Sequence, residues 1–539
     1  MASKKSRMHG PEAKVRSHSP VTSPVLPKKT AAEKITGIIA QLEGLDVPYH
    51  YYIMTFLAAI SLRNVMEIMV AQNVTRIFWY TALHYSLFYA SLLLNIILLL
   101  HFMSGEKVGA VSKIVMAGFI VTATVPITDV LLQLVWRYDI TYLYMVPEKT
   151  RSIWRNYLLF FGEHKGATPG MRVEIFTVMV CSAIYVYLKT HSKIRAALTA
   201  LLIYSLIFWL YGAIIYLILG AEKLFGLPFD TSFGMMIDVY LFLVLHSLLL
   251  VFIMFRPAYA KALLRDFRTT RIVHYELMML VGIAIGYPPA IGFSQRLSTF
   301  MELYFAAAAI VFACVYSTIT NNLADIGIDR ISNPDRPSVT AAIPHRTYER
   351  IGHICLSLAV LYALAAGYQT LFLLACFIGN YFLYSMPPLR LKRVPVLSKF
   401  LIALNCLLMM LVGYAFVGRQ IPLFPTATST FVLVVFTACI NFIDIKDYQG
   451  DKAEGIKTLP VLLGLPWSKR LIGLFLLTGY ALVPYFLDMP DLYVPALTSG
   501  ALIFFLVVRK KYTEWPVFTV YLASVIYFLI YVTAKHNLQ

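Results

Sequence analysis

The sequence has little charge for its length. Only 14% of its 539 residues are Asp, Glu, Lys or Arg, whereas 59% are hydrophobic. A soluble protein of this size needs more polar side chains to cover its surface. The apolar residues instead form repeated runs of about 20 residues, the length with which an α-helix crosses the hydrocarbon core of a membrane. These features exclude an ordinary soluble protein and predict an all-α, multi-pass integral membrane protein.

Cysteine is also scarce, and the few cysteines lie inside apolar runs without forming any CxxC pair. This placement is typical of small core residues and argues against a disulfide framework or a thiolate metal site. The six positions are Cys181, Cys314, Cys355, Cys376, Cys406 and Cys439.

Acidic residues are outnumbered by basic ones, 28 to 46, which gives a formal net charge of +18. The basic residues occupy short loops between apolar runs, so membrane topology explains them and no nucleic-acid partner is expected. Residues 1–30 are basic, rich in Ser and Pro, and lack the apolar core of a signal peptide. They are predicted to form a disordered cytosolic tail, either inert or in contact with anionic membrane lipids.

Candidate spans fall into two groups on either side of a basic segment that runs from Arg256 to Arg271. This segment predicts a boundary between an N-terminal helical membrane domain, 31–255, and a C-terminal domain, 256–539. An amphipathic stretch near 31–46 precedes the first six spans, near 49–70, 78–102, 110–136, 172–190, 196–220 and 232–255. The nine later spans lie near 272–293, 300–320, 351–367, 369–385, 397–416, 427–444, 468–487, 492–508 and 513–533.

Loop charge predicts which side of the C-terminal domain faces the cytosol. Lys and Arg concentrate in the loops that follow its second, fourth, sixth and eighth spans. Basic loops stay in the cytosol, and an even number of N-terminal spans leaves residues 1–30 on that side too. The loop at 137–171 is basic yet falls on the opposite side, so the division of the N-terminal half into spans stays open.

Two acidic motifs with the same spacing lie at the cytosolic ends of two C-terminal spans. The first reads NNLADIGID over 321–329, and the second reads NFIDIKDYQGD over 441–451. Oxygen-bearing side chains recur at i, i+3 and i+7, which predicts a bundle with internal pseudo-symmetry. The matched pairs, each 122 positions apart, are Asn322 with Asp444, Asp325 with Asp447, and Asp329 with Asp451.

This spacing predicts a site for Mg²⁺ and pyrophosphate. Positions i, i+3 and i+7 share one helix face, so each motif gathers like charges that need compensation. Mg²⁺ can compensate these charges, because this ion prefers carboxylates together with substrate phosphate and water as ligands. The Asn322 carbonyl oxygen can bind the ion directly or through a water molecule. Basic side chains flank the motifs, among them Arg336, Lys446 and those of YSMPPLRLKR (384–393). Fixed cations of this kind stabilise the charge of a departing pyrophosphate.

Other interpretations stay open from the residues alone. Solvated helix ends explain one such motif easily but explain two with matching spacing poorly. A cation-coupled transporter also uses intramembrane acids, although these usually lie near the bilayer midplane on interrupted helices. A non-catalytic membrane scaffold on the same bundle is a further alternative.

The C-terminal half resembles the UbiA superfamily of intramembrane prenyltransferases. NNLADIGIDRISNPDRP is similar to the family's first motif, NDxxDxxxD followed by a segment such as DRINRPDRP. DIKDYQGDKAEGIKTLP is similar to the second motif, DxxDxxxD continuing as GDxxxGxKTLP, and YSMPPLRLKR is similar to the family loop YSxPPxRLKR. The resemblance covers about 265–535 and implies the family's nine-helix bundle.

The resemblance also implies roles for individual residues. Asn321, Tyr384 and Lys392 or Arg393 would bind pyrophosphate. Asn322 departs from the family pattern, which usually has Asp there, so the second motif is expected to carry more of the Mg²⁺ affinity. The catalytic residues, which with Asn322 would bind Mg²⁺ and pyrophosphate, would be Asp325, Asp329, Asp444, Asp447 and Asp451.

The implied reaction is Mg²⁺-dependent transfer of an isoprenyl group from an allylic isoprenyl diphosphate, such as geranylgeranyl diphosphate. The acceptor would be a lipid, a quinone precursor or another aromatic compound, and pyrophosphate would leave. The apolar interior of the spans would hold the isoprenoid tail and keep water from the allylic cation.

The resemblance does not extend to the N-terminal half. Arg63 and Glu67 lie one helical turn apart in an apolar span and are expected to neutralise each other. This domain is expected to dock a partner protein, present a lipid substrate or mediate homo-oligomers.

Overall fold

The computed structural model describes residues 30–70, 79–137, 140, 150–162, 167–227, 233–287, 297–453 and 455–538. Every regular element in these ranges is a helix, which confirms the predicted all-α class. Of the predicted disordered tail, 1–30, only Thr30 belongs to the described residues.

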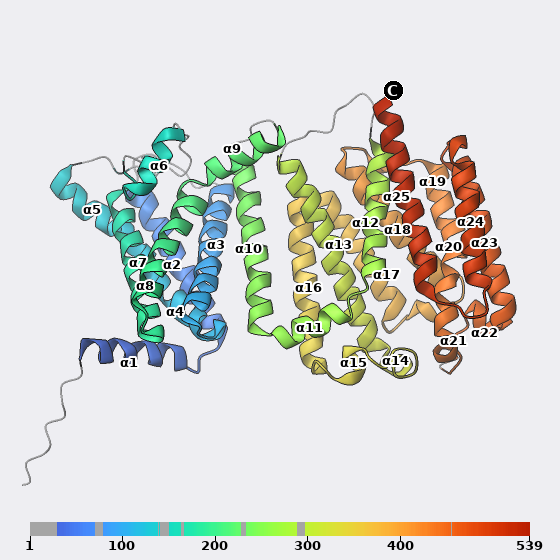
Figure 1. Cartoon of the computed structure of the whole chain (residues 1–539), viewed down its shortest axis with the longest axis horizontal. Helices are drawn as coiled ribbons and strands as arrows, with labels where there is room; N and C mark the ends of the chain where they lie inside the picture. Colours follow the sequence, from blue (N-terminus) through green and yellow to red (C-terminus); the bar gives the residue numbers. More distant parts are fainter. Residues whose placement is uncertain are drawn as a thin grey trace, which may run out of the picture.

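The N-terminal helices form a bundle on the left of Figure 1. α1 (Ala31–Gly44) lies across its lower end and starts at a capping box, in which the Thr30 and Glu33 side chains each accept the other residue's backbone N–H. The other helices of this half are α2 (Tyr49–Val70), α3 (Trp79–Ser104), α4 (Val108–Gly118), α5 (Thr124–Trp136), α6 (Thr150–Leu158), α7 (Pro169–Thr190), α8 (Lys193–Leu206), α9 (Ile214–Phe225) and α10 (Phe233–Phe255).

The C-terminal helices form a second, larger bundle on the right of Figure 1. Short helices α11, α14, α15, α21 and α22 gather at its lower end, and long ones run between the two ends. The elements are α11 (Pro257–Arg265), α12 (Thr269–Gly286), α13 (Leu297–Ala324), α14 (Ile326–Ser332), α15 (Pro337–Thr340), α16 (His345–Ala366), α17 (Tyr368–Ser385), α18 (Leu397–Phe416), α19 (Thr426–Thr430), α20 (Thr437–Cys439), α21 (Asp444–Ala453), α22 (Leu459–Leu463), α23 (Leu465–Phe486), α24 (Tyr493–Val508) and α25 (Glu514–Leu538).

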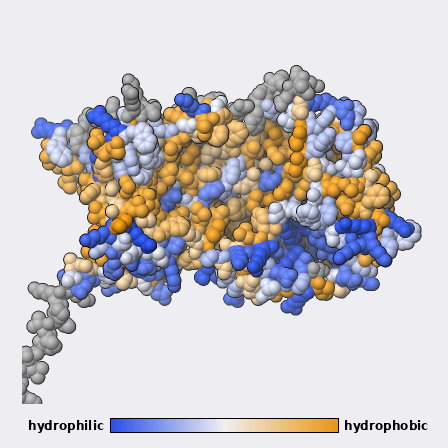
Figure 2. Space-filling model, in the orientation of Figure 1, coloured by the Kyte–Doolittle hydropathy of each residue, from blue (hydrophilic) through white to orange (hydrophobic). Residues whose placement is uncertain are grey.

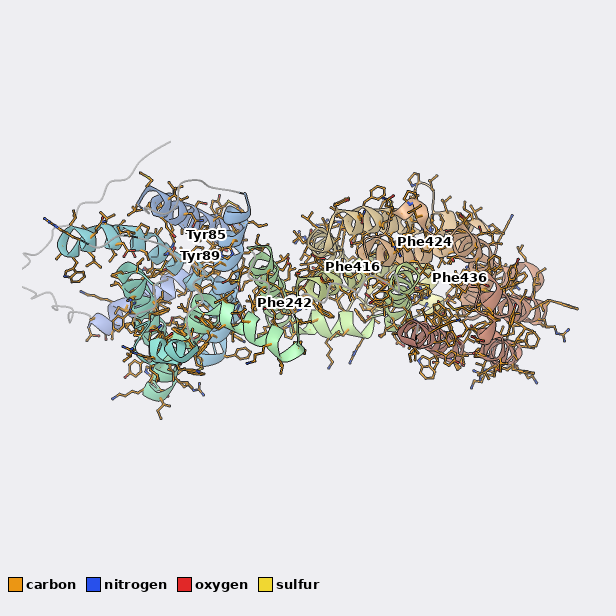
Figure 3. The ribbon with its side chains drawn as sticks, turned by 90° about the horizontal axis from the view of Figure 1, so that it is seen from above. Tyr85, Tyr89, Phe242, Phe416, Phe424 and Phe436 are labelled. Atoms are coloured by element: carbon orange, nitrogen blue, oxygen red, sulfur yellow. The ribbon has the colours of Figure 1, made fainter. Side chains whose placement is uncertain are left out.

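α10 joins the two bundles. Its Tyr240 belongs to the apolar core of the N-terminal bundle, whereas its Leu245 belongs to the main core of the C-terminal bundle. Seen from above, Phe242 lies between the labelled tyrosines of one bundle and the labelled phenylalanines of the other (Figure 3). The domain boundary at 255/256 stays a prediction, because α10 packs on both sides.

Helix length and composition support a membrane protein. Among the described residues, 12 helical segments are long and apolar enough to cross a membrane. They include neither α12 nor α17 nor α23, which occupy three of the predicted spans, so the predicted number of spans is not confirmed. Figure 2 shows a broad hydrophobic band with hydrophilic residues gathered most densely along the lower margin of the C-terminal bundle.

Two glycines bring α12 and α18 into close contact. A Cβ atom on Gly282 would lie 1.8 Å from the Met410 carbonyl oxygen, and one on Gly413 would lie 1.9 Å from that of Met279. Small residues allow this backbone approach between membrane helices. The contact fixes α12, which carries Arg271, against α18, which carries Lys399.

The predicted pairing of Arg63 with Glu67 is confirmed. Both side chains are almost fully buried, and Arg63 Nε lies 3.4 Å from Glu67 Oε2. Glu174 of α7 joins them, 3.1 Å from Arg63 Nη1. The buried arginine is thus paired with carboxylates inside the apolar bundle, as the burial of a charge requires.

Candidate active site

The first motif lies where α13 gives way to α14. Asp325 separates the two helices, and its backbone N–H donates to the Asn321 carbonyl at 3.0 Å. The Asp329 N–H donates in turn to the Asp325 carbonyl at 2.9 Å. Helical hydrogen bonding therefore continues across the break, and the polar side chains of 321–329 stay close together.

The second motif begins α21, after an irregular helical stretch of 431–443. α14 and α21 pack against each other, so the two motifs lie on neighbouring helices at the lower end of the bundle (Figure 1). Tyr384, at the end of α17, interacts electrostatically with Asp325 of the first motif and with Asp444 and Asp451 of the second. The tyrosine predicted for pyrophosphate therefore lies between the motifs.

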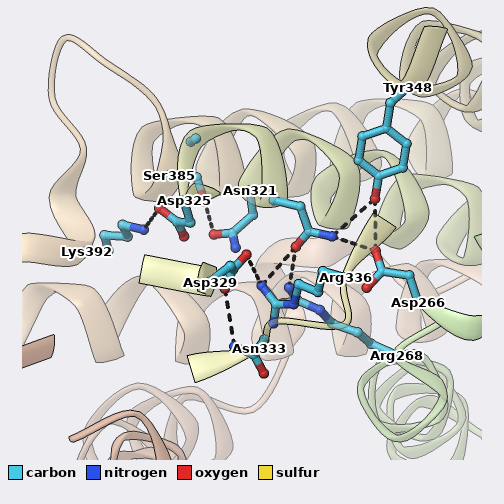
Figure 4. A network of polar contacts seen from close by, with 12 residues as sticks. Asp266, Arg268, Asn321, Asp325, Asp329, Asn333, Arg336, Tyr348, Ser385 and Lys392 are labelled. Atoms are coloured by element: carbon cyan, nitrogen blue, oxygen red, sulfur yellow. Dashed lines mark hydrogen bonds and ion pairs between the residues drawn. The ribbon is translucent and has the colours of Figure 1, made fainter. Parts of the chain in front are cut away.

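Protein cations compensate the first-motif carboxylates. Asp325 Oδ1 accepts from Arg390 Nη2 at 2.8 Å and also from Lys392 Nζ. Asp329 pairs with Arg336 through Oδ2 and accepts from Asn333 Nδ2 at 3.2 Å through Oδ1. Burial lowers the pKa of Lys392 while Asp325 opposes that effect. The predicted residues Arg336 and Lys392 thus reach the first motif directly (Figure 4).

Asn322 lies at the centre of a polar network. Its Oδ1 accepts from Arg268 Nη2 at 2.7 Å and from Arg336 Nη1 at 3.1 Å. Its Nδ2 donates to Asp266 Oδ2 at 2.5 Å and to Tyr348 Oη at 3.1 Å. Figure 4 labels the four partners, Asp266, Arg268, Arg336 and Tyr348, in this network. Its predicted role as a Mg²⁺ ligand stays a prediction, and here the amide oxygen contacts two guanidinium groups.

Burial affects the charged partners of Asn322. It raises the pKa of Asp266, against the hydrogen bond from Tyr348 and the charges of Arg268 and Arg336. It lowers the pKa of Arg268 to about 10, with Arg271 and Arg336 adding to the effect. Arg268 is therefore still protonated at neutral pH.

The second motif has a different cation. Asp444 Oδ1 lies 2.6 Å from Lys399 Nζ, and both side chains are nearly buried. The other oxygen, Asp444 Oδ2, is buried and has no hydrogen-bond partner among the described residues. Asp447 interacts electrostatically with Arg271 at the start of α12. One buried carboxylate oxygen of this motif is thus available to a cation.

The remaining predicted residues divide into two groups. Asn321 Oδ1 accepts from Ser385 Oγ at 3.0 Å, which ties the first motif to the end of α17. Lys446 forms an ion pair with Glu514 of α25, and both charges also act on Asp447 of the second motif, whereas Arg393 is exposed. Positions 444 and 446 differ by two residues, and side chains two apart point to different faces of a helix.

The donor set fits Mg²⁺. Asp325, Asp329, Asp444, Asp447 and Asp451 would supply hard oxygen ligands, the kind that Mg²⁺ prefers, and Asp444 Oδ2 is a buried acceptor without a hydrogen-bond partner among the described residues. No group of three or more acidic, His or Cys side chains is already assembled for a metal in the described part of the chain. The first-motif carboxylates face arginine and lysine instead, so phosphate oxygens are needed to complete a coordination shell.

Several site residues were not predicted. Asp266, Arg268 and Arg271 belong to the segment that was interpreted only as a domain boundary, and Tyr348 and Lys399 were not singled out. Arg390 was named only as part of the basic segment 384–393. The available signal was the run of basic residues Arg265, Arg268 and Arg271 just before an apolar span. In the structure α11 ends at Arg265 and α12 begins at Thr269, so the three do not share one helix face.

An apolar cavity of about 870 Å³ extends from the motifs into the bundle. Arg271 and Tyr381 are among its polar lining residues, with Met278, Phe431 and Phe528 among the apolar ones. Arg271 lies one turn from Arg268, which contacts the first motif, so this end of the cavity adjoins the motifs. The other walls come from α18 and α23 to α25 and the stretch 428–443.

Comparison with known proteins identifies the C-terminal half. Residues 277–532 match the model of the UbiA prenyltransferase family. A digeranylgeranylglyceryl phosphate synthase of Pyrococcus horikoshii is 26% identical over 215 residues, which cover 40% of this chain and 73% of that protein. A 2-acylphloroglucinol 4-prenyltransferase of Humulus lupulus is 30% identical over 198 residues, 33% of this chain and 44% of that protein.

A similar chain is also found among solved structures. A UbiA homologue from Archaeoglobus fulgidus bound to DMAPP and Mg²⁺ aligns with a TM-score of 0.42 and 19% identity, over 51% of this chain and 99% of that one. The family match and the related sequences confirm the resemblance seen in the motifs: residues 277–532 of this chain are similar to the UbiA prenyltransferase family.

Proposed function

We propose that the C-terminal bundle transfers an isoprenyl group from an allylic isoprenyl diphosphate to a lipid or aromatic acceptor and releases pyrophosphate in a Mg²⁺-dependent reaction. The observation that carries this proposal is the position of the two aspartate motifs. They lie on packed helices, surrounded by Arg336, Lys392 and Lys399, at one end of an apolar cavity of about 870 Å³. A charged site next to an apolar cavity matches a substrate with a diphosphate head and a hydrocarbon tail.

Each part of the site has a task in this reaction. The five aspartates would hold Mg²⁺, which supplies positive charge to the departing pyrophosphate. Arg268, Arg336 and Lys392 bind phosphate oxygens and stabilise the charge that develops as the carbon–oxygen bond breaks. The cavity encloses the isoprenoid tail and excludes water, so that the acceptor rather than water attacks the allylic carbon.

The acceptor is proposed from the relatives. The Pyrococcus horikoshii relative is named for a glyceryl phosphate product, whereas the Humulus lupulus relative is named for an aromatic one. The segment DRISNPDRP also looks like the lipid-forming, chlorophyll and homogentisate branches of the family. We therefore favour a lipid, quinone or chromanol-type product.

Topology and domain roles complete the proposal. We infer from the basic loops that the motifs face the cytosol. The N-terminal domain, 31–255, would present lipid substrate, dock a partner or mediate homo-oligomers, and 256–539 would carry catalysis. A chain that starts at Arg256 tests this division, because undiminished transfer in the same membranes would remove substrate presentation from the roles.

The reaction is tested with the full chain in membranes that contain candidate acceptors. Geranylgeranyl diphosphate and Mg²⁺ are added, pyrophosphate release is followed, and the product is identified by mass spectrometry. We expect Mg²⁺-dependent release and a prenylated product, both lost in Asp325→Ala and Asp447→Ala. Release that is unchanged in both variants would contradict the proposal.

A further inference from the structure

The Asn322 cluster, defined as Asp266, Arg268, Asn322, Arg336 and Tyr348, contains a buried amide at its centre. The Asn322 side chain is 0% exposed and uses its full hydrogen-bonding capacity. Its oxygen accepts two hydrogen bonds and its nitrogen donates two, which is all that an amide can make. No lone pair of this oxygen is left for a cation.

Counted together with Asp329, the ion-pair partner of Arg336, the charges of the cluster balance only because residue 322 is neutral. Arg268 and Arg336 face Asp266 and Asp329, with Asn322 and Tyr348 between them. An aspartate at 322 would bring a second carboxylate within about 2.5 Å of Asp266 Oδ2, the distance that the Asn322 nitrogen now spans. Two carboxylates this close must share a proton, or a bound cation must lie between them, because their negative charges repel each other.

We propose that Asn322 is a positioning residue, which together with Asp266 fixes the Arg268 and Arg336 guanidinium groups to receive the diphosphate. The inference rests on the proposed prenyl transfer. Arg336 contacts both Asn322 and Asp329, and Arg268 contacts Asn322 from the start of α12. Each arginine is therefore held by one nitrogen and keeps other N–H groups for phosphate, a group that arginine recognises well.

This role makes Asn322 more than a weakened copy of the family's acidic position. If residue 322 were a metal ligand, Asn322→Asp would strengthen Mg²⁺ use. If it is the centre of a charge-balanced cluster, the same change is harmful unless Asp266 is also changed. In Asp266→Asn/Asn322→Asp the same number of charges is present, and the contact between 266 and 322 forms again with donor and acceptor exchanged.

The test compares wild type, Asn322→Asp, Asp266→Asn and the double variant as full chains in detergent. Wild-type prenyl transfer is measured first, since its absence would defeat the proposed function and not this inference. We expect Asn322→Asp to raise KM for geranylgeranyl diphosphate by about tenfold or more, Asp266→Asn to raise it less, and the double variant to recover to within about threefold of wild type. If KM recovers when the second substitution is added, although that substitution is harmful alone, then residues 266 and 322 act as a directly interacting pair.

A binding measurement separates positioning from folding. Inorganic pyrophosphate in EDTA is tested for the rise in melting temperature that it causes in each variant. We expect the rise to shrink in Asn322→Asp and to return in the double variant. Asn380→Asp, which buries a new carboxylate on α17 among other amide contacts, is the control and is expected to lower the melting temperature without changing KM.

Two outcomes overturn the proposal. In the first, Asn322→Asp matches or exceeds wild type and needs less Mg²⁺, which would make residue 322 a metal ligand. In the second, the double variant has a KM no better than Asn322→Asp. If Asn322→Asp does not accumulate as folded protein, Tyr348→Phe is used, which removes one donor to Asp266. An unchanged KM and unchanged pyrophosphate protection in that variant would also contradict the cluster's role.

Discussion

Lys399 of α18 reaches Asp444, the first residue of α21, with its ammonium nitrogen 2.6 Å from the carboxylate. Both side chains are almost completely buried, Lys399 at 4% and Asp444 at 7% exposure. This ion pair ties the second motif to the helix that packs most closely on α12.

Replacing one member of this pair is expected to be costly. Lys399→Met leaves a buried carboxylate without its cation, and such changes destabilise by about 3–5 kcal/mol. Lys399→Met/Asp444→Asn removes both charges and is expected to recover most of the stability but none of the activity. Thermal unfolding and pyrophosphate release in the same preparations check this, and an active double variant would show that Asp444 is dispensable.

The two motifs are expected to differ in their use of Mg²⁺. First-motif carboxylates already contact Arg336, Arg390 and Lys392, whereas Asp444 keeps a buried oxygen without a hydrogen bond. Conservative Asp444→Asn is therefore expected to raise the Mg²⁺ concentration needed for half-maximal rate by more than Asp325→Asn does. Mg²⁺ titrations of pyrophosphate release measure both values, and the reverse order would contradict the assignment.

Lys392 and Lys446 were both predicted from the sequence to bind pyrophosphate, but their substitutions are expected to change KM by different amounts. Lys392 contacts Asp325 of the first motif, whereas Lys446 is paired with Glu514. Lys392→Met is expected to raise KM for the isoprenyl diphosphate by about tenfold or more, since a charge-assisted contact is lost. Lys446→Met is the matched control with a smaller effect, and steady-state kinetics on both variants decide. Equal effects would mean that Lys446 also reaches the substrate.

Cavity shape is expected to control chain length. Ala523 of α25 lines the cavity, so Ala523→Trp fills part of the space for the tail. The ratio of kcat/KM for geranylgeranyl over geranyl diphosphate should fall by several-fold, because apolar pockets discriminate by about 1–3 kcal/mol per methylene. Ile526→Trp, at an exposed position of the same helix, is expected to leave the ratio unchanged. An unaltered ratio in Ala523→Trp would place the tail elsewhere.

Close packing of α12 on α18 is expected to tolerate no Cβ atom. Gly282→Ala would bring a methyl group to 1.8 Å from the Met410 carbonyl oxygen, so the helices must separate. Overpacking of this kind costs about 1–3 kcal/mol or more. Gly379→Ala is the control, because a Cβ there meets nothing within 4 Å. Thermal unfolding in detergent compares the two, and equal melting temperatures would contradict this packing.

The linear sequence determined the class of the protein and much of its chemistry. Apolar runs long enough to cross a membrane predict helices, because a helix forms all of its backbone hydrogen bonds within one segment and so leaves none unpaired in lipid. The repeated aspartates, with their spacing and neighbours, predicted a site for Mg²⁺ and pyrophosphate and the resemblance to the UbiA prenyltransferase family, which the match over residues 277–532 confirms. These features are local in the chain, so the amino-acid sequence is enough to recognise them.

Tertiary structure decided the partners of each charge. Lys399 and Asp444 are 45 positions apart, and Asp266 and Asn322 are 56 apart, so spacing in the chain says nothing about either contact. Lys446 lies between two motif aspartates in the sequence but turns to Glu514 because it occupies another helix face. The sequence motif suggested that Asn322 is a weakened metal ligand. Only the folded structure shows that its amide oxygen accepts hydrogen bonds from two arginines and that its nitrogen donates to the Asp266 carboxylate. A buried charge takes its partner from whichever helix packs beside it, and that neighbour is set by the fold.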